Sequence, residues 1–460
     1  MRGQSSKRNS EDVNRSLRVA APFHDQKYGE RGAALLLFSI LLLLVVLPMI
    51  GLAIDGGVAY FAHARLVSAA DAAALAGARS LNVGEDFAAQ KQNAESIAGQ
   101  YFYANFPASF LGSKNVAFKA DAEETGTHIR TVTVSATADL PVYFLGLLGH
   151  QSTSVATTAQ ASRRDVNIVL TLDRSGSMSR VCGTMVASAQ SFVSKFSNGR
   201  DTMGLITFMG NASVDFPSTL TFDSQSPNLN ATLAKLKCGG NTGSAAALYT
   251  AHQQIKKVAE PGALNVIVFF TDGEPNGFSA GPAPAGFPVK SGGACNGGKP
   301  LEGFVAHDDG IYSLSPVAIN VIVIPRTTCF GNMQYLAKTF QYIPDTDAYG
   351  NSAWATGYKP VQRDAQNNII FTGSNSDAVS ANAADDAARQ IRNEGIFIYT
   401  IGLDGDGGLD NVLLKRIAND PTGSTYDASK PTGMYAYAGN AGQLAAAFNS
   451  IASEVLRISQ

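Results

Sequence analysis

Charge, tryptophan and histidine are all scarce in this sequence. Of its 460 residues, 16% are charged, one is tryptophan, four are cysteine and six are histidine. The formal net charge is −2, so neither sign is in large excess. A protein that binds nucleic acid usually carries a strongly basic domain or stripe. The composition therefore predicts no nucleic-acid partner.

A catalytic arrangement is also missing. The histidines are scattered, and none has the spacing of a zinc-binding pair. No set of serine, histidine and carboxylate, or of cysteine and histidine, can be assigned from sequence positions. One Gly-x-Ser-x-Gly pattern occurs at residues 277–281, but it lies in a stretch rich in proline and glycine. A hydrolase nucleophile instead follows a strand and precedes a helix. We therefore expect that this protein is not an enzyme.

One long apolar stretch is present. Residues 32–54 are 23 consecutive residues without a charge, enough to cross a bilayer and more than the apolar core of a signal peptide needs. Residues 1–31 carry seven basic and four acidic side chains and no hydrophobic period. Because they have no hydrophobic period, they are predicted to form a disordered tail. Cytoplasmic flanks of membrane helices are enriched in Lys and Arg, so this tail is predicted to be cytoplasmic. The stretch predicts one uncleaved transmembrane helix, with the C-terminal part periplasmic or extracellular.

Residues 55–162 predict a small α+β stalk region. Strong helix formers continue the apolar helix to about residue 81, and a second helical segment is expected at 87–102. Between residues 116 and 161, apolar and hydroxyl side chains alternate as they do in strands. This region would separate the membrane from the domain that follows.

Residues 163–460 alternate between two kinds of pattern. The predicted strands are 166–172, 203–208, 266–270 and 396–401, and the predicted helices are 185–196, 245–258, 381–393, 409–418 and 443–456. This alternation predicts an α/β fold with a doubly wound parallel sheet and helices on both faces. About 100 residues, at about 275–375, exceed what such a fold needs, and they predict a long insertion.

Oxygen-bearing side chains follow the first predicted strand. Asp173, Ser175 and Ser177 are spaced by single residues directly after it. A carboxylate and two hydroxyls are hard oxygen ligands of the kind that Mg²⁺ prefers. None of them is a strong base, so the pattern favours cation binding over catalysis. The alternative is that the serines only cap the next helix.

Two further segments complete this pattern. Thr242 lies in a glycine-containing loop before the predicted helix 245–258. Asp272 directly follows the predicted strand 266–270. In this order and context, the three segments resemble the metal-ion-dependent adhesion site of von Willebrand factor A (vWA) domains.

The resemblance implies one divalent cation, Mg²⁺ with Mn²⁺ or Ca²⁺ as alternatives. The implied ligands are Ser175, Ser177 and Thr242 directly, and Asp173 and Asp272 directly or through water. A partner protein would supply an acidic residue to the remaining coordination position. The oligomeric state has no signal in the sequence.

A second resemblance covers residues 29–80. The sequence Glu-Arg-Gly-Ala-Ala at 30–34, the apolar run, Asp-Gly-Gly at 55–57 and the alanine-rich stretch 70–78 resemble the N-terminal region of TadE/TadG-like proteins. These are inner-membrane components of the Flp (Tad) pilus assembly machinery, and many carry a vWA domain after this anchor. The resemblance implies an inner (cytoplasmic) membrane location and pilus assembly components as partners.

We therefore expect a membrane-anchored vWA protein that binds a partner protein through a divalent-cation adhesion site in Flp pilus assembly or anchoring. Two alternatives stay open. One is a vWA partner subunit of a chelatase-type ATPase, and the other is a structural vWA domain without a metal function.

The predicted cation site also predicts how the cysteines pair. If Ser177 and Thr242 bind one ion, Cys182 and Cys238 lie on adjacent loops, whereas Cys295 and Cys329 both lie in the insertion. Of the three possible pairings, we therefore predict Cys182–Cys238 and Cys295–Cys329. An oxidising compartment would permit both bonds. Four buried free thiols are the alternative.

Overall fold

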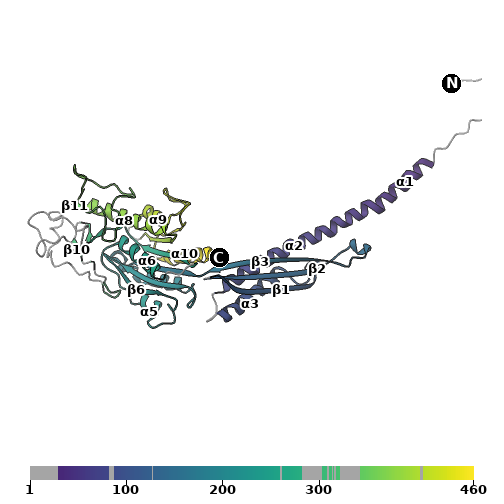
Figure 1. Ribbon diagram of the computed structural model, residues 1–460, viewed down its shortest axis with the longest axis horizontal. Coiled ribbons are helices and arrows are strands. Elements are labelled where there is room, and N and C mark those ends of the chain that lie inside the picture. The colour runs from purple at the N-terminus through teal and green to yellow at the C-terminus, as the bar shows by residue number, and fades with distance from the viewer. Residues whose placement is uncertain are drawn as a thin grey trace, which may run out of the picture.

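A long helix, a small α+β stalk and an α/β domain follow one another along the chain (Figure 1). The structure is a computed structural model, and the residues that it describes are 29–81, 87–126, 128–258, 262–281, 303–307, 310–312, 314, 317–321, 342–404 and 408–459. Most of the predicted N-terminal tail and the predicted Cys295–Cys329 bond lie outside these residues.

The N-terminal helix is continuous over three segments. It comprises α1 (Gly29–Leu41), a π-helical turn η1 (Leu42–Val46) and α2 (Leu47–Ser80). Pro48 at the start of α2 lacks an N–H and crowds the carbonyl one turn earlier, which accounts for the widened turn. Among the described residues, one helix, Gly32–Ser80, is long and apolar enough to cross a membrane, and its most apolar part is not buried in protein. Its length and composition are those expected of a membrane-spanning helix.

The stalk packs two helices on one face of a sheet. Its elements are the C-terminal half of α2, α3 (Phe87–Asn105), and the antiparallel strands β1 (Lys114–Gly126), β2 (Ile129–Pro141) and β3 (Ser152–Arg164), in the order β1-β2-β3. The alanine-rich stretch of α2 is buried here. A Cβ added to Gly77 would lie 3.1 Å from Val132 Cγ1 and 3.2 Å from the Ala94 carbonyl oxygen. Small residues therefore allow α2 to approach both α3 and β2 closely.

The α/β domain is built on a six-stranded sheet. Its strands are β4 (Val166–Asp173), β5 (Thr202–Phe208), β6 (Ala212–Thr219), β7 (Leu264–Thr271), β13 (Phe397–Leu403) and β14 (Tyr435–Ala438), in the order β14-β13-β7-β4-β5-β6. The predicted doubly wound sheet is confirmed. The edge strand β6 is antiparallel to β5, which the sequence did not indicate. Only three residues join the two strands, too few for a parallel crossover.

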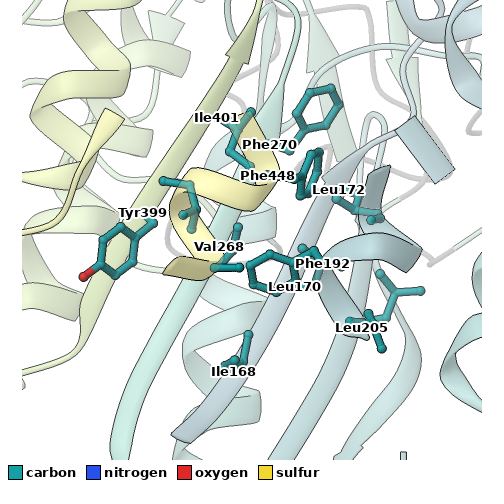
Figure 2. Close-up of a cluster of buried hydrophobic side chains, with 14 of the residues drawn as sticks. Ile168, Leu170, Leu172, Phe192, Leu205, Val268, Phe270, Tyr399, Ile401 and Phe448 are labelled. Atoms are coloured by element: carbon teal, nitrogen blue, oxygen red, sulfur yellow. The ribbon is translucent and has the colours of Figure 1, made fainter. Parts of the chain in front are cut away.

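Helices cover both faces of this sheet. One face carries α4 (Cys182–Val193) and α10 (Leu444–Ile458), and the other carries α6 (Ser244–Val258), α8 (Gly373–Asn393) and α9 (Asn411–Ala418). Figure 2 shows Phe192 of α4 and Phe448 of α10 above the inward-facing residues of the strands, such as Leu170. The strands are buried on both faces, so they read as continuous apolar runs.

Short elements complete the described part of the chain. They are α5 (Leu229–Leu233) and the 3₁₀ turns η2 (Phe110–Gly112), η3 (Leu145–Leu148), η4 (Ser177–Arg180) and η6 (Ala441–Gln443). Between β7 and α8 lie β8 (Gly277–Ala280), β9 (Gly303–Ala306), β10 (Gly310–Tyr312), β11 (Tyr342–Ile343) and β12 (Ile369–Ile370). Phe278, Ile343 and Phe371 form a small core with Val379 of α8. The described part of the predicted insertion thus packs beside the main sheet.

The stalk joins the α/β domain at the amino ends of the parallel strands. β3 ends at Arg164 and β4 begins at Val166, so Asp165 alone separates them. The backbone N–H of Arg164 donates to the carbonyl of Ser459, just after α10. Both ends of the α/β domain therefore meet the stalk at one place.

Two buried ion pairs lie at this joint. Arg200 Nε is 2.5 Å from Asp165 Oδ1, and Arg163 Nη2 is 3.1 Å from Asp201 Oδ2. Arg200 also donates to the carbonyl of Leu81, just after α2. Burial, together with the nearby charge of Arg163, lowers the pKa of Arg200 to about 10. The joint therefore links the stalk and the domain through charges that water does not reach.

Candidate metal centre

The predicted ligands come from segments that meet at the carboxyl edge of the sheet. Asp173 is the last residue of β4, and Asp272 directly follows β7. These two strands are parallel neighbours, with Leu172 paired to Phe270. Since parallel strands end at the same edge, residues about one hundred positions apart become adjacent, as expected of a site in an open α/β sheet.

Four of the five predicted side chains form a connected set. Ser177 Oγ donates to Asp272 Oδ1 over 2.7 Å, and the hydroxyl oxygens of Ser175 and Ser177 are 3.1 Å apart. The backbone N–H of Ser175 donates to Asp173 Oδ1 over 2.8 Å. The Thr271 hydroxyl donates to Asp173 Oδ2 over 2.6 Å. The turn after β4 therefore points its oxygens toward the end of β7.

Thr242 reaches this set through the backbone of its loop. Gly176 N–H donates to Gly240 O over 2.8 Å, and Gly239 N–H donates to Arg174 O over 2.7 Å. Thr242 itself is 5% exposed, and its N–H donates to Asn276 Oδ1 over 2.8 Å. The structure thus holds the third predicted segment against the first.

A disulfide links the same two segments. Cys182 and Cys238 are bonded, with their Cα atoms 6.0 Å apart. This pairing confirms one of the two predicted bonds. It closes the Thr242 loop onto the start of α4, so that both loops of the site are covalently held.

The electrostatics of the set favour a cation. Asp173 is completely buried, and its burial and the negative charge of Asp272 together raise its pKa to about 7. No ion pair involves Asp173 in the part of the chain that the structure describes. The neighbouring Arg174 points away and donates to the carbonyls of Val317 and Val321. A divalent ion would place a positive charge beside the two adjacent carboxylates of Asp173 and Asp272.

The chemistry of the donors narrows the choice of ion. The described residues contain no group of three or more His, Cys, Asp or Glu that could hold a metal. The set instead combines two carboxylates with hydroxyls, which are hard ligands suited to Mg²⁺ or Mn²⁺ rather than to softer metals. The residues present therefore fit the ion that the sequence predicted.

Sequence reasoning missed three supporting residues. Thr271 holds the buried carboxylate of Asp173, and Asn276 holds the Thr242 backbone on both sides, since its own N–H donates to Thr242 O over 3.2 Å. Gly243 lies against the loop after β5, where a Cβ would be 2.3 Å from Gly210 O. Thr271 and Asn276 are close to Asp272 in the sequence, and this closeness is the only sequence signal for their supporting role. Gly243 has no such signal.

Comparison with known families agrees with both resemblances. Residues 168–274 match the family of von Willebrand factor type A domains, and residues 32–80 match the family described as Flp pilus-assembly TadE/G-like. The chain thus joins a TadE/G-like N-terminal segment to a vWA domain. The vWA match ends where the insertion begins, and the TadE/G-like match ends with α2, so each ends at a structural boundary of the chain.

Similar folds occur among solved structures of pilus proteins. The vWF domain of the type V pili tip protein Mfa5 from Porphyromonas gingivalis is 19% identical, with a TM-score of 0.39, over 65% of this chain and 98% of that one. The PilB minor pilin from Streptococcus sanguinis is 16% identical, with a TM-score of 0.39, over 76% of this chain and 80% of that one.

The pilus adhesin SpaC from Lactobacillus rhamnosus GG is 14% identical, with a TM-score of 0.38, over 75% of this chain. This chain spans only 34% of the SpaC chain. No curated protein matches the chain. Identities and scores this low carry no argument about ligands or partners.

Proposed function

We propose that the vWA domain binds a partner protein through a divalent cation, Mg²⁺ or alternatively Mn²⁺ or Ca²⁺. The proposed ligands are Asp173, Ser175, Ser177, Thr242 and Asp272. The observation that carries the proposal is the 2.7 Å contact between Ser177 Oγ and Asp272 Oδ1, which joins positions 95 residues apart at an edge rich in buried oxygens.

The burial of the ligands is graded, which suits a shared ion. Asp173 and Ser175 are buried, whereas Ser177 is exposed and Asp272 is half-buried. The buried side would hold the ion, and the exposed side would let an acidic side chain of the partner complete the coordination shell. Charges attract more strongly in such a partly dry site than in bulk water. The function proposed is adhesion, not catalysis.

The insertion forms part of the surface around this site. A Cβ on Gly243, beside Thr242, would lie 3.0 Å from Phe304 Cε2 of β9. The N–H of His307, which follows β9, donates to Asn276 O over 2.7 Å. We therefore expect the insertion to shape the surface that a partner contacts.

The setting that we propose is Flp pilus assembly or anchoring. The TadE/G-like match and the apolar helix support an inner-membrane protein with a cytoplasmic N-terminus and a periplasmic or extracellular vWA domain. The Cys182–Cys238 bond supports the same orientation, since disulfides persist in oxidising compartments. It argues against a cytoplasmic partner of a chelatase-type ATPase.

Calorimetric titration of the detergent-solubilised full chain with Mg²⁺, Mn²⁺ and Ca²⁺ tests the cation site. We expect binding by the wild type, none by Asp173→Ala, and at least about tenfold weaker binding by Asp272→Asn, roughly 1.4 kcal/mol. Glu274→Gln is the matched control, because Glu274 is exposed two residues away and lies outside the ligand set. The proposal is wrong if the wild type binds none of these ions, or if Glu274→Gln loses as much affinity for the ion as Asp272→Asn.

Affinity purification from cells, with and without a chelator, tests the partner. We expect a protein that is captured by the wild type, lost with chelator and lost with Ser177→Ala. A chain that binds Mg²⁺ but captures the same proteins with and without chelator would be a structural vWA domain. That result would refute adhesion and keep the metal site.

A further inference from the structure

The connection between β2 and β3 is attached to the membrane helix. Its hairpin tip, residues 143–145, lies against α2, where the carboxylate of Asp55 accepts three backbone hydrogen bonds. The donors are the N–H groups of Tyr143 at 2.9 Å, Phe144 at 2.9 Å and Leu145 at 2.8 Å. Asp55 is only 4% exposed. A carboxylate that satisfies three backbone donors fixes the hairpin tip to the helix.

The helix has a recess for the hairpin tip. A Cβ added to Gly51 would lie 2.4 Å from Cγ of Phe144, so only glycine leaves room for this ring. Beyond it, a groove of about 590 Å³ is lined by Phe144, Leu145 and apolar residues between Leu43 and Leu52. The apolar side chains here are far from buried: Leu44 is 66% exposed and Phe144 is 38% exposed.

The position of the groove along the helix indicates what covers it. Arg31 and Asp55 are the charged residues that bound the apolar run. From Arg31, about 20 helical residues at 1.5 Å each span the roughly 30 Å hydrocarbon core of a bilayer and end near Gly51. The Phe144 ring therefore lies at the outer boundary of the hydrocarbon, and the groove extends inward from it. Apolar surface at this depth faces lipid.

We propose that the hairpin tip inserts into the outer leaflet of the membrane, with lipid acyl chains filling the groove. Tyr143, which is 60% exposed, would lie at the headgroup level, where amphipathic aromatic rings are enriched. The inference rests on the membrane anchor and does not depend on the metal centre.

A second point of attachment would restrict the stalk. A single helix leaves an extracytoplasmic domain free to swing, whereas a helix and an inserted loop fix its tilt. The strands β2 and β3 pair over their whole length, from Ile129 opposite Arg164 to Pro141 opposite Ser152. The hairpin therefore moves as one rigid unit. In Figure 1 this hairpin extends from the α/β domain toward the N-terminal part of the long helix.

Depth-dependent quenching in vesicles tests the insertion. The full chain, carrying Trp354→Phe and Tyr143→Trp, is reconstituted into phosphatidylcholine–phosphatidylglycerol vesicles with or without brominated acyl chains. We expect a severalfold loss of tryptophan emission in the brominated vesicles. The matched control is Tyr101→Trp in the same background, because Tyr101 is 52% exposed on α3. It lies beside Ala72, roughly 30 Å further along the helix, and should not be quenched.

A pair of glycine substitutions tests whether the recess positions the hairpin tip. Gly51→Ala, in the Tyr143→Trp chain, should displace the Phe144 ring and reduce quenching. Gly57→Ala should not, because a Cβ there has no atom within 4 Å. The two changes add the same methyl group to the same helix.

Three outcomes would overturn the inference. Equal and weak quenching at positions 143 and 101 would place the hairpin tip in water or under another protein. Quenching that appears only when vesicles hold single chains would assign the groove to a second copy of this chain. Quenching that Gly51→Ala and Gly57→Ala change equally would show that the recess plays no part.

Discussion

At the scale of single residues, the candidate metal centre depends on a position that has no side chain. Gly243 donates its N–H to Met209 O over 2.6 Å, and it packs against the Gly210 carbonyl. This contact sets where α6 begins and where Thr242, one residue earlier, can place its hydroxyl. A proposed ligand residue is therefore positioned by a neighbour that has no side chain.

We predict that Gly243→Ala weakens Mg²⁺ binding about tenfold or more, equivalent to roughly 1.4 kcal/mol. A Cβ at 2.3 Å from the Gly210 carbonyl forces the backbone apart, and such overpacking costs about 1–3 kcal/mol in the free energy of unfolding. Calorimetry and thermal unfolding of the full chain measure the two effects.

The control for this prediction is Gly183→Ala in α4, where a Cβ would have no atom within 4 Å. It should leave both binding and unfolding nearly unchanged. If Gly243→Ala bound Mg²⁺ like the wild type, Thr242 would not be part of the coordination shell.

At the scale of elements, the connection between β3 and β4 decides how the stalk and the vWA domain are coupled. Arg163 near the end of β3 pairs with Asp201, which directly precedes β5, and both side chains are essentially unexposed. Asp201 also accepts the N–H groups of Val166 and Ser197. The buried carboxylate of Asp201 thus binds both Arg163 of the stalk and the backbone of the vWA domain.

A double-mutant cycle measures this coupling. Arg163→Met and Asp201→Leu should each cost about 3–5 kcal/mol in the free energy of unfolding, because each leaves a buried charge without its partner. The double variant should lose clearly less than the sum. Urea unfolding of the full chain provides the four values.

The exposed pair Arg457–Glu454 on α10 is the control for this cycle, since its arginine side chain is 66% exposed. Its coupling should stay below about 1 kcal/mol. Strict additivity at Arg163 and Asp201 would mean that the joint is not held by their interaction.

At the scale of the whole molecule, the candidate metal centre lies at the end of the vWA domain that points away from the stalk. The joint is at the amino end of β4, and Asp173 is at its carboxyl end. Eight residues of strand at about 3.3 Å each separate them by roughly 25 Å. In Figure 1 the insertion strands β10 and β11 lie at the end of the molecule opposite to α1. A partner can therefore approach the site without contacting the stalk or the membrane.

The proposed orientation predicts the redox state of Cys182 and Cys238 in living cells. Acid trapping, alkylation and peptide mapping should find these two residues bonded in the full chain. A chain that lacks residues 32–54 should stay in the cytoplasm and show both as thiols, because the cytoplasm is reducing. Thiols in the anchored chain would contradict an extracytoplasmic vWA domain.

Local sequence was sufficient for the long apolar helix and for most strands and helices of the sheet domain. Apolar runs and periods act within one element, so they can be read without knowing its neighbours. The pairing of Cys182 with Cys238 could be predicted only because a family resemblance placed Ser177 beside Thr242. The Cys295–Cys329 pairing stays a prediction.

The tertiary structure alone decided which surfaces meet. It placed Asp55 under the hairpin tip about ninety residues away, paired Arg163 with Asp201, turned β6 antiparallel and set Asn276 beneath Thr242. Each of these contacts joins groups that are ordinary in their own segments. Their partners are chosen by the burial and hydrogen bonding of the whole fold, which leaves no period or spacing in the sequence to read.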